Sequence, residues 1–207
     1  MPRNVRMVKP NFMRAIFLLI TLFFSNNTDA QREYFTIKNY NITLNVQPDG
    51  IVDVREEIMV HFDTLRRGIF RRIPIRYQTD QGNLKFKLSQ IQVDGWDYIV
   101  YDEGNDKVIR IGEEDVFIDG QQQYVISYRA KNSFLWHEDR PEIYWNLVGT
   151  GWPVDIEKIE YEVFFPEDLD IDPGDYQIFT GTEGAEEVSA SLQKRGNRIF
   201  GSSTRAF

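Results

Sequence analysis

The sequence has no cysteine and only two histidines among its 207 residues. Without cysteine it cannot form disulfides, thiolate metal sites or a cysteine nucleophile. His61 and His137 lie on different segments, and neither has the serine or aspartate setting of a catalytic triad or the second histidine of a zinc-binding helix. We therefore predict a protein without a cofactor, stabilised by its apolar core alone.

Basic residues are also fewer than acidic ones. The 24 lysines and arginines are outnumbered by 32 aspartates and glutamates, for a net charge of −8. The first 30 residues hold four of the basic residues and one acidic residue, so the remainder is more acidic still. A nucleic-acid-binding domain needs a cationic face. The charge balance therefore excludes nucleic acid as a partner and argues against a domain that lies flat on anionic lipid.

Long apolar runs are absent apart from one near the N-terminus. Ala15–Phe24 is a ten-residue apolar stretch, half of the ~20 residues that a transmembrane helix requires. The basic segment Met1–Arg14 precedes it, and the short polar segment Ser25–Ala30 follows. This order is typical of a secretory signal peptide. We predict a signal peptide over residues 1–30 and a mature domain over residues 31–207, exported to the periplasm or the cell surface.

The mature chain alternates apolar and polar residues with a period of two, which indicates strands. Tyr40–Val46 and Val52–Phe62 flank the turn Pro48-Asp49-Gly50, so they are expected to form an antiparallel hairpin, with Glu56 in an inward position. The alternation that begins at Leu84 slips by one position before Val93, which predicts a bulge near Ser89-Gln90. In all we expect about nine or ten short strands, the last a weak pair at Ala190–Leu192 and Arg198–Phe200, and no long helix. The predicted fold is all-β, an antiparallel β-sandwich of the immunoglobulin-like kind, with a closed barrel as the second choice.

Three blocks of sequence carry a family resemblance. They are Pro48-Asp49-Gly50 with Val54, Glu56, Glu57 and Phe62; Gly68-Ile-Phe-Arg-Arg-Ile-Pro74; and the stretch from Tyr124 through Tyr144-Trp145-Asn146 and Gly151-Trp152-Pro153-Val154 to Phe165-Pro166. Together they resemble the N-terminal extracytoplasmic domain of a bacterial "predicted membrane protein" family, a domain of unknown function, over about residues 34–166.

The resemblance implies a longer architecture. Members of that family have a signal peptide, an extracytoplasmic β-rich domain and then hydrophobic membrane segments. This sequence has no such segment before Phe207. We therefore expect it to be a C-terminally truncated version of a membrane-anchored protein, whose membrane association depends on segments absent from this chain.

Two arginines stand out because they lie in an apolar setting. Arg71 and Arg72 follow Phe70 and precede Ile73. An inward Glu56 needs a partner, because a buried unpaired charge is costly. We predict that Glu56 or Glu57 pairs with Arg71 or Arg72 and that the other arginine lies in solvent. The alternative is an anion or carboxylate site, which a guanidinium fork suits.

Other residues suggest weaker sites. Trp136 precedes a polar run and is the best candidate for stacking on a sugar, whereas Trp145 alternates within a strand and should be core. Asp168, Asp170 and Asp172 resemble the start of a calcium loop, but Pro173 stands where an EF-hand needs glycine. No pattern selects a pair of carboxylates for glycoside hydrolysis.

These observations favour a non-catalytic interaction domain, with an unknown protein or glycan as partner. A cell-surface carbohydrate-binding module is the first alternative, and a carboxylate-based hydrolase is the second.

The signal peptide gives the first prediction. Protein recovered from the exported fraction of the native host should begin at or near Gln31, because Thr28 and Ala30 occupy the small-residue positions of a cleavage site. N-terminal sequencing or intact mass checks this. Recovery of intact Met1 in that fraction would contradict it.

Overall fold

The computed structural model describes residues 17–23, 35–79, 82–136, 141–149, 151–167, 169, 172, 176–181 and 188–207. These residues form sixteen strands and no helix, so the all-β prediction is confirmed. Within the same residues, no helix is long and apolar enough to cross a membrane.

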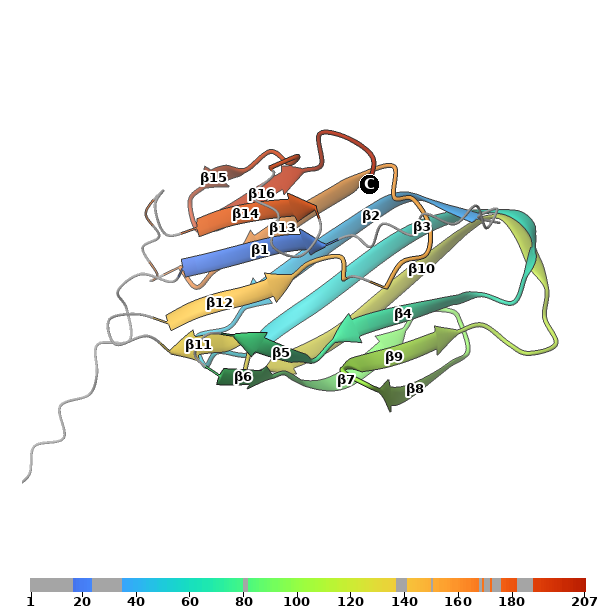
Figure 1. The fold of residues 1–207 in the computed structure, drawn as a ribbon, viewed down its shortest axis with the longest axis horizontal. Helices are drawn as coiled ribbons and strands as arrows, with labels where there is room; N and C mark the ends of the chain where they lie inside the picture. Colours follow the sequence, from blue (N-terminus) through green and yellow to red (C-terminus); the bar gives the residue numbers. More distant parts are fainter. Residues whose placement is uncertain are drawn as a thin grey trace, which may run out of the picture.

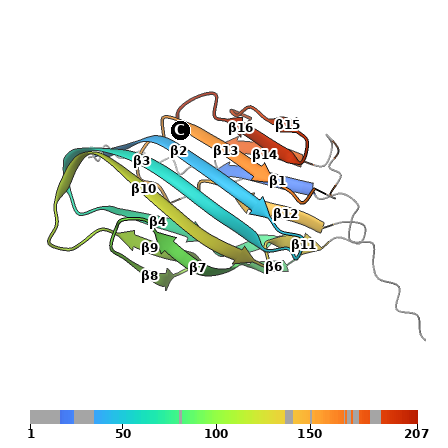
Figure 2. The same ribbon diagram turned by 180° about the vertical axis from the view of Figure 1, so that it is seen from behind.

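A seven-stranded sheet forms the back of the molecule (Figures 1 and 2). Its order is β15 (Gln193–Arg195), β16 (Arg198–Ser202), β13 (Ile159–Phe164), β2 (Phe35–Val46), β3 (Val52–Arg66), β10 (Ile118–Lys131) and β7 (Lys87–Val93). The predicted hairpin is its centre, since β2 pairs antiparallel with β3 around the turn at Gly50. Side chains alternate between buried and exposed along β3, as expected for a sheet with one covered face.

The sheets are mixed, so the prediction of purely antiparallel pairing is wrong. β13 lies parallel to β2, with Ile159 opposite Tyr40 and Val163 opposite Leu44. Parallel neighbours need a long crossover, and here most of the chain lies between the two strands. Alternation of apolar and polar residues shows that one face of a strand is buried. It does not show whether the neighbouring strand runs parallel or antiparallel. The immunoglobulin-like arrangement stays a prediction.

A four-stranded sheet lies across the front of the long sheet (Figure 1). Its order is β11 (Phe134–Trp136), β12 (Pro141–Asn146), β1 (Phe17–Phe23) and β14 (Tyr176–Gly181). β1 belongs to the segment predicted to be a signal peptide, and it pairs in parallel with both β12 and β14. The cleavage prediction is untested by this arrangement, which includes the uncleaved N-terminal segment.

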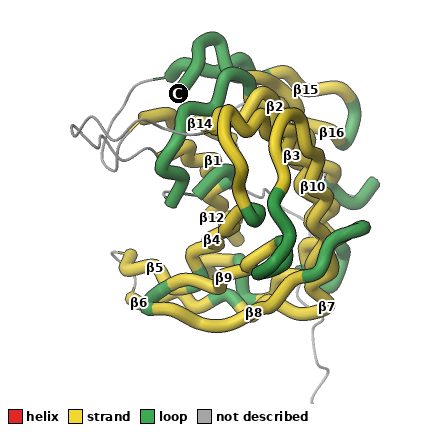
Figure 3. Tube along the Cα trace, turned by 90° about the vertical axis from the view of Figure 1, so that its right-hand side faces the viewer, coloured by secondary structure: helices red, strands yellow, loops and turns green. Residues whose placement is uncertain are grey.

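The third layer is a three-stranded sheet with the order β4 (Ile69–Pro74), β9 (Asp106–Ile111) and β8 (Tyr98–Glu103), and it continues into the hairpin of β5 (Arg76–Thr79) and β6 (Gly82–Lys85). Figure 3 shows the long sheet along one side, with β9 and β8 across the bottom near β7. All the buried apolar residues of the described part of the chain except Val108 form one continuous core.

The expected count of nine or ten strands was too low. Strands β1, β4, β5 and β11 were not predicted, and the strand expected from Leu84 to Val93 is divided into β6 and β7. The weak pair expected near the C-terminus is β15 and β16. The expected irregularity near Ser89-Gln90 is confirmed, because Gln90 has a φ of 51° and the register of β7 against β10 shifts there.

Two glycines lie against each other at one end of the β4–β9 pair: Gly68 precedes β4, and Gly112 follows β9. Gly68 has a φ of 134°, and a Cβ on it would lie 1.8 Å from the carbonyl oxygen of Ile111; a Cβ on Gly112 would lie 1.9 Å from the carbonyl oxygen of Arg67. The two backbones are therefore in contact, which only glycine allows. This contact fixes the position of β4, the strand that carries Arg71 and Arg72.

Gly68→Ala should lower the free energy of unfolding by about 3 kcal/mol. Alanine is strained at this positive φ, and its Cβ would also force the backbone at Ile111 to move. The matched control is Gly104→Ala, since Gly104 also has a positive φ of 59° but has nothing within 4 Å of a Cβ; it should cost about 1 kcal/mol. Urea denaturation measures both. Equal losses would show that the Gly68 contact is not tight.

Candidate functional site

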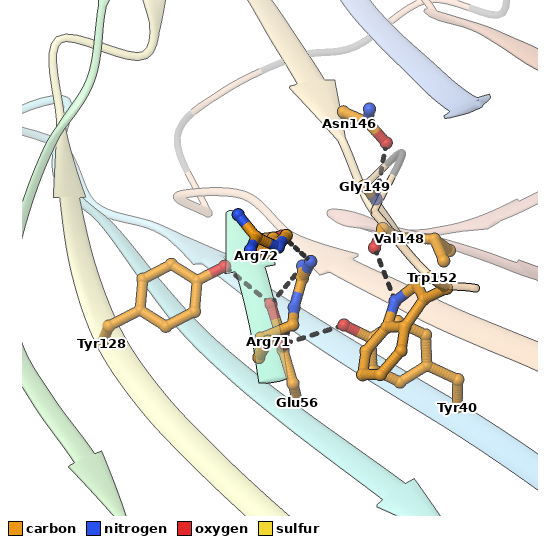
Figure 4. Close-up of polar contacts among 9 residues, drawn as sticks. All are labelled: Tyr40, Glu56, Arg71, Arg72, Tyr128, Asn146, Val148, Gly149 and Trp152. Atoms are coloured by element: carbon orange, nitrogen blue, oxygen red, sulfur yellow. Dashed lines mark hydrogen bonds and ion pairs between the residues drawn. The ribbon is translucent and has the colours of Figure 1, made fainter. Parts of the chain in front are cut away.

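A charged pair lies inside the core, on elements from two sheets (Figure 4). Glu56 of β3 is 0% exposed and Arg71 of β4 is 1% exposed. The guanidinium binds the carboxylate through two bonds: Nε donates to Oε2 at 2.7 Å, and Nη2 donates to Oε1 at 2.9 Å. This bidentate geometry is the strong form of an ion pair, and it ties β4 to the long sheet.

Two tyrosines complete the coordination of Glu56. The Tyr40 hydroxyl donates to Oε2 at 2.7 Å, and the Tyr128 hydroxyl donates to Oε1 at 2.8 Å. Glu56 lies opposite Ile42 on β2 and Ile126 on β10. Each tyrosine is therefore a diagonal neighbour on the same face. Four donors around two oxygens suit an ionised carboxylate, which only accepts hydrogen bonds.

The rest of the Arg71 side chain is also occupied. Its Nη1 donates to the carbonyl of Arg72. The guanidinium carbon lies 5.8 Å from the ring centroid of Tyr40 and 6.0 Å from that of Trp152, within cation–π range. The two rings pack edge to face, with centroids 6.0 Å apart. The Arg71 side chain is only 2% exposed, so these contacts enclose it.

The protonation states follow from this packing. Burial raises the pKa of Tyr40 and of Tyr128 well above the usual value, and the Glu56 carboxylate adds to the effect, so both hydroxyls stay protonated and donate. Burial alone would lower the pKa of Arg71, but the adjacent Glu56 carboxylate outweighs it and the net shift is upward. Arg71 therefore stays charged at all physiological pH values.

A turn after β12 closes over the pair. Gly149 has a φ of 83°, and a Cβ there would lie 2.7 Å from Nη1 of Arg71 and 3.2 Å from the carbonyl oxygen of Arg72. Its N–H donates to Oδ1 of Asn146 at 2.9 Å, and Nε1 of Trp152 donates to the carbonyl of Val148 at 3.1 Å. The Gly-Ile-x-Arg and Tyr-Trp-Asn…Gly-Trp-Pro blocks of the sequence therefore meet around one guanidinium.

Of the four residues predicted to pair, the structure brings together Glu56 and Arg71. Glu57 accepts a bond of 2.9 Å from Arg55 on the exposed face. Arg72 lies 3.0 Å from Glu103, with a third of its side chain exposed. The pairing is thus split between one buried pair and two surface pairs.

The other predicted site residues are not assembled into a site. The Trp136 side chain, Asp168 and Asp170 lie outside the described residues, and Asp172 is exposed. His61 is half-exposed beside Asp63. Among the residues that the structure describes, no three His, Asp or Glu side chains are placed to hold a metal ion.

A second feature lies on the surface of the three-stranded sheet. All but one of the large exposed apolar residues in the described part of the chain fall between Leu65 and Phe117. Phe70, Arg110 and Ile99 form one row across β4, β9 and β8, on the face opposite the buried Ile69, Arg71 and Ile73. We call this the outer face.

A pocket of about 410 Å³ adjoins the outer face, lined in part by Leu65, Arg67, Phe70, Arg110 and Phe117. The Arg67 guanidinium lies 4.7 Å from the centroid of the Phe117 ring, an exposed cation–π contact. Apolar and cationic side chains meet here, and Glu113 and Glu114 also line the pocket. Aromatic residues and arginine are enriched at protein-binding surfaces.

Sequence reasoning missed the roles of Tyr40 and Tyr128. Each tyrosine lies two residues from the residue opposite Glu56 on a neighbouring strand. Identifying them as its donors therefore requires the register of three strands. The outer face was missed because an exposed face becomes visible only once the strand order is known.

The chain matches the family model described as "Predicted membrane protein (DUF2207) N-terminal domain" over residues 36–204. It is 27% identical over 189 residues to the uncharacterized protein YciQ of Escherichia coli strain K12, an alignment that covers 83% of this chain and 29% of that protein. The chain thus spans less than a third of this relative's length. The match confirms the resemblance predicted from the three sequence blocks.

The solved structures that align with the chain share little sequence with it. Leukotriene A4 hydrolase from Saccharomyces cerevisiae has a TM-score of 0.46 at 8% identity, over 82% of this chain and 27% of that one. An M1 zinc metallopeptidase from Deinococcus radiodurans has a TM-score of 0.41 at 9% identity, over 82% and 38%. No functional conclusion follows from similarity at this level.

Arg71→Ala should lower the free energy of unfolding by about 3–5 kcal/mol, because it leaves Glu56 buried and unpaired. Arg72→Ala, one residue away and on the surface, should cost about 1 kcal/mol or less. Thermal and urea denaturation measure both.

A double replacement sharpens this test. Glu56→Leu with Arg71→Met, made in a Tyr40→Phe and Tyr128→Phe background so that no buried hydroxyl loses its acceptor, should recover much of the loss, because the buried charges are removed together. Similar losses for Arg71→Ala and Arg72→Ala would mean that the buried pair does not support the fold.

Proposed function

Since the chain belongs to the predicted membrane protein (DUF2207) family, as the N-terminal domain of its members, we propose that it is a non-catalytic protein-interaction domain. It acts outside the cytoplasm, where the predicted signal peptide directs it, and the rest of a longer protein holds it at the membrane. It binds a partner protein through the outer face of β4, β9 and β8.

The character of the buried cluster supports a structural role for it. A catalytic acid, base or anion site must reach a substrate. Glu56 and Arg71 are fully buried, and four protein donors already surround the carboxylate. The cluster therefore stabilises the fold, and chemistry or binding has to lie elsewhere.

The observation that carries the proposal is the concentration of exposed apolar side chains on one surface. Phe70 is 51% exposed and Ile99 is 49% exposed, and both flank Arg110 in the same row. Contiguous exposed apolar residues mark interaction surfaces, and aromatic residues with arginine are the ones that contribute most to protein interfaces.

Site-specific photo-crosslinking in the native host tests the proposal. A photoreactive amino acid in place of Phe70 should give protein adducts, whereas the same group in place of Lys158, an exposed residue just before β13 of the long sheet, should give few. A glycan array with the purified protein tests the carbohydrate alternative. Sugar binding without adducts at Phe70 would favour the carbohydrate module and count against a protein-interaction domain.

A further inference from the structure

Strand β8 is an edge strand with an unusual surface. It has β9 on one side and no strand on the other among the described residues, and it lies at the outer margin of the molecule in Figures 1, 2 and 3. Ile99, Val100 and Tyr101 are consecutive and are 49%, 38% and 37% exposed. Natural proteins usually protect such edges with charge or proline, and the centre of β8 has neither.

The hydrogen-bonding pattern shows which backbone groups of β8 are directed outward. Asp97 accepts a bond from the N–H of Gly112 at 2.8 Å, and Glu103 lies opposite Asp106 across a two-residue turn. Because bonded pairs alternate in an antiparallel ladder, Ile99 and Tyr101 also bond to β9. The N–H and C=O groups of Tyr98, Val100 and Asp102 therefore point away from β9, and no described residue bonds to them.

These outward groups are arranged symmetrically about Val100. If two copies of β8 pair antiparallel around a two-fold axis at Val100, then Val100 bonds to its own counterpart and Tyr98 bonds to Asp102 of the other copy. All three outward residues are satisfied, by about six hydrogen bonds. Shifting the register by two residues in either direction leaves one of the three without a strand partner.

The side chains agree with the same register. It places Ile99 opposite Tyr101 of the other copy on the outer face, a β-branched and aromatic pair of the kind that stabilises sheets. The acidic end of β8 is already neutralised within each copy, because Asp102 pairs with Lys107 and Glu103 lies 3.0 Å from Arg72. Charge at the ends therefore opposes pairing less than the sequence alone indicates.

We infer that β8 is a self-association site, through which two copies of this chain join their three-stranded sheets into one. The inference deepens the proposed function, on which it rests, by naming a second copy as one partner of the sheet that carries the outer face. The contact is a short edge, so it belongs to the weak, transient class of interfaces. The net charge of −8 on each copy opposes it, so association should strengthen as salt screens that charge.

Disulfide trapping tests the register directly, because the chain has no cysteine of its own. Val100→Cys should give a covalent dimer under mild oxidation, since the two-fold axis brings that residue against itself at a Cα separation of about 5.5 Å. Ile99→Cys is the matched control, because its counterpart lies diagonally across the new ladder, at about 7–8 Å. It should cross-link at least fivefold less.

Sedimentation velocity on the unmodified protein, from about 5 µM to about 500 µM, should show a weight-average mass that rises with concentration. Val100→Pro should abolish the rise without unfolding the protein, because the lost N–H points away from β9. Circular dichroism checks its folding, and Val100→Lys serves if proline unfolds it. A monomer throughout that range, or equal cross-linking at residues 99 and 100, would overturn the inference. In that event, adducts to other proteins at Phe70 would leave the proposed function intact.

Discussion

The architecture depends on one buried ion pair. Glu56 stands in the middle of the long sheet and Arg71 in the middle of β4, so their bidentate contact joins two layers that share no backbone hydrogen bonds. A pair of charges in a core is costly unless it is fully satisfied. The structure meets this cost with two tyrosine hydroxyls, a backbone carbonyl and a glycine turn that leaves room for the guanidinium.

The buried ion pair and the exposed apolar residues lie on opposite faces of β4. Because the polar cluster around Glu56 and Arg71 is enclosed, it holds the layers together and does not contact solvent. The strand that carries Arg71 on one face carries Phe70 on the other. The ion pair therefore also fixes the outer face, where exposed apolar residues and arginines collect over β4, β9 and β8.

Part of this was predictable from sequence. The central hairpin, the irregularity at Gln90 and the inward position of Glu56 all follow from local period-two alternation. β4 escaped prediction for a physical reason, since its inward series is Ile69, Arg71 and Ile73, and an arginine in an apolar phase conceals the period. The tyrosine partners of Glu56 depend on the register of three strands, and the parallel pairing of β2 with β13 depends on distant segments. Neither is encoded locally.

The residues of β1 also belong to the predicted signal peptide, so the prediction of export depends on when β1 folds. Its partners β12 and β14 lie more than a hundred residues downstream, so on the ribosome they emerge long after β1 does. If the segment is a signal peptide, as the sequence predicts, a targeting receptor meets it as free chain, before the strands that would pair with it have been made. If translocation is delayed until synthesis ends, the same residues can instead pair with β12 and β14. The fraction of the protein that is exported then depends on the relative rates of targeting and folding.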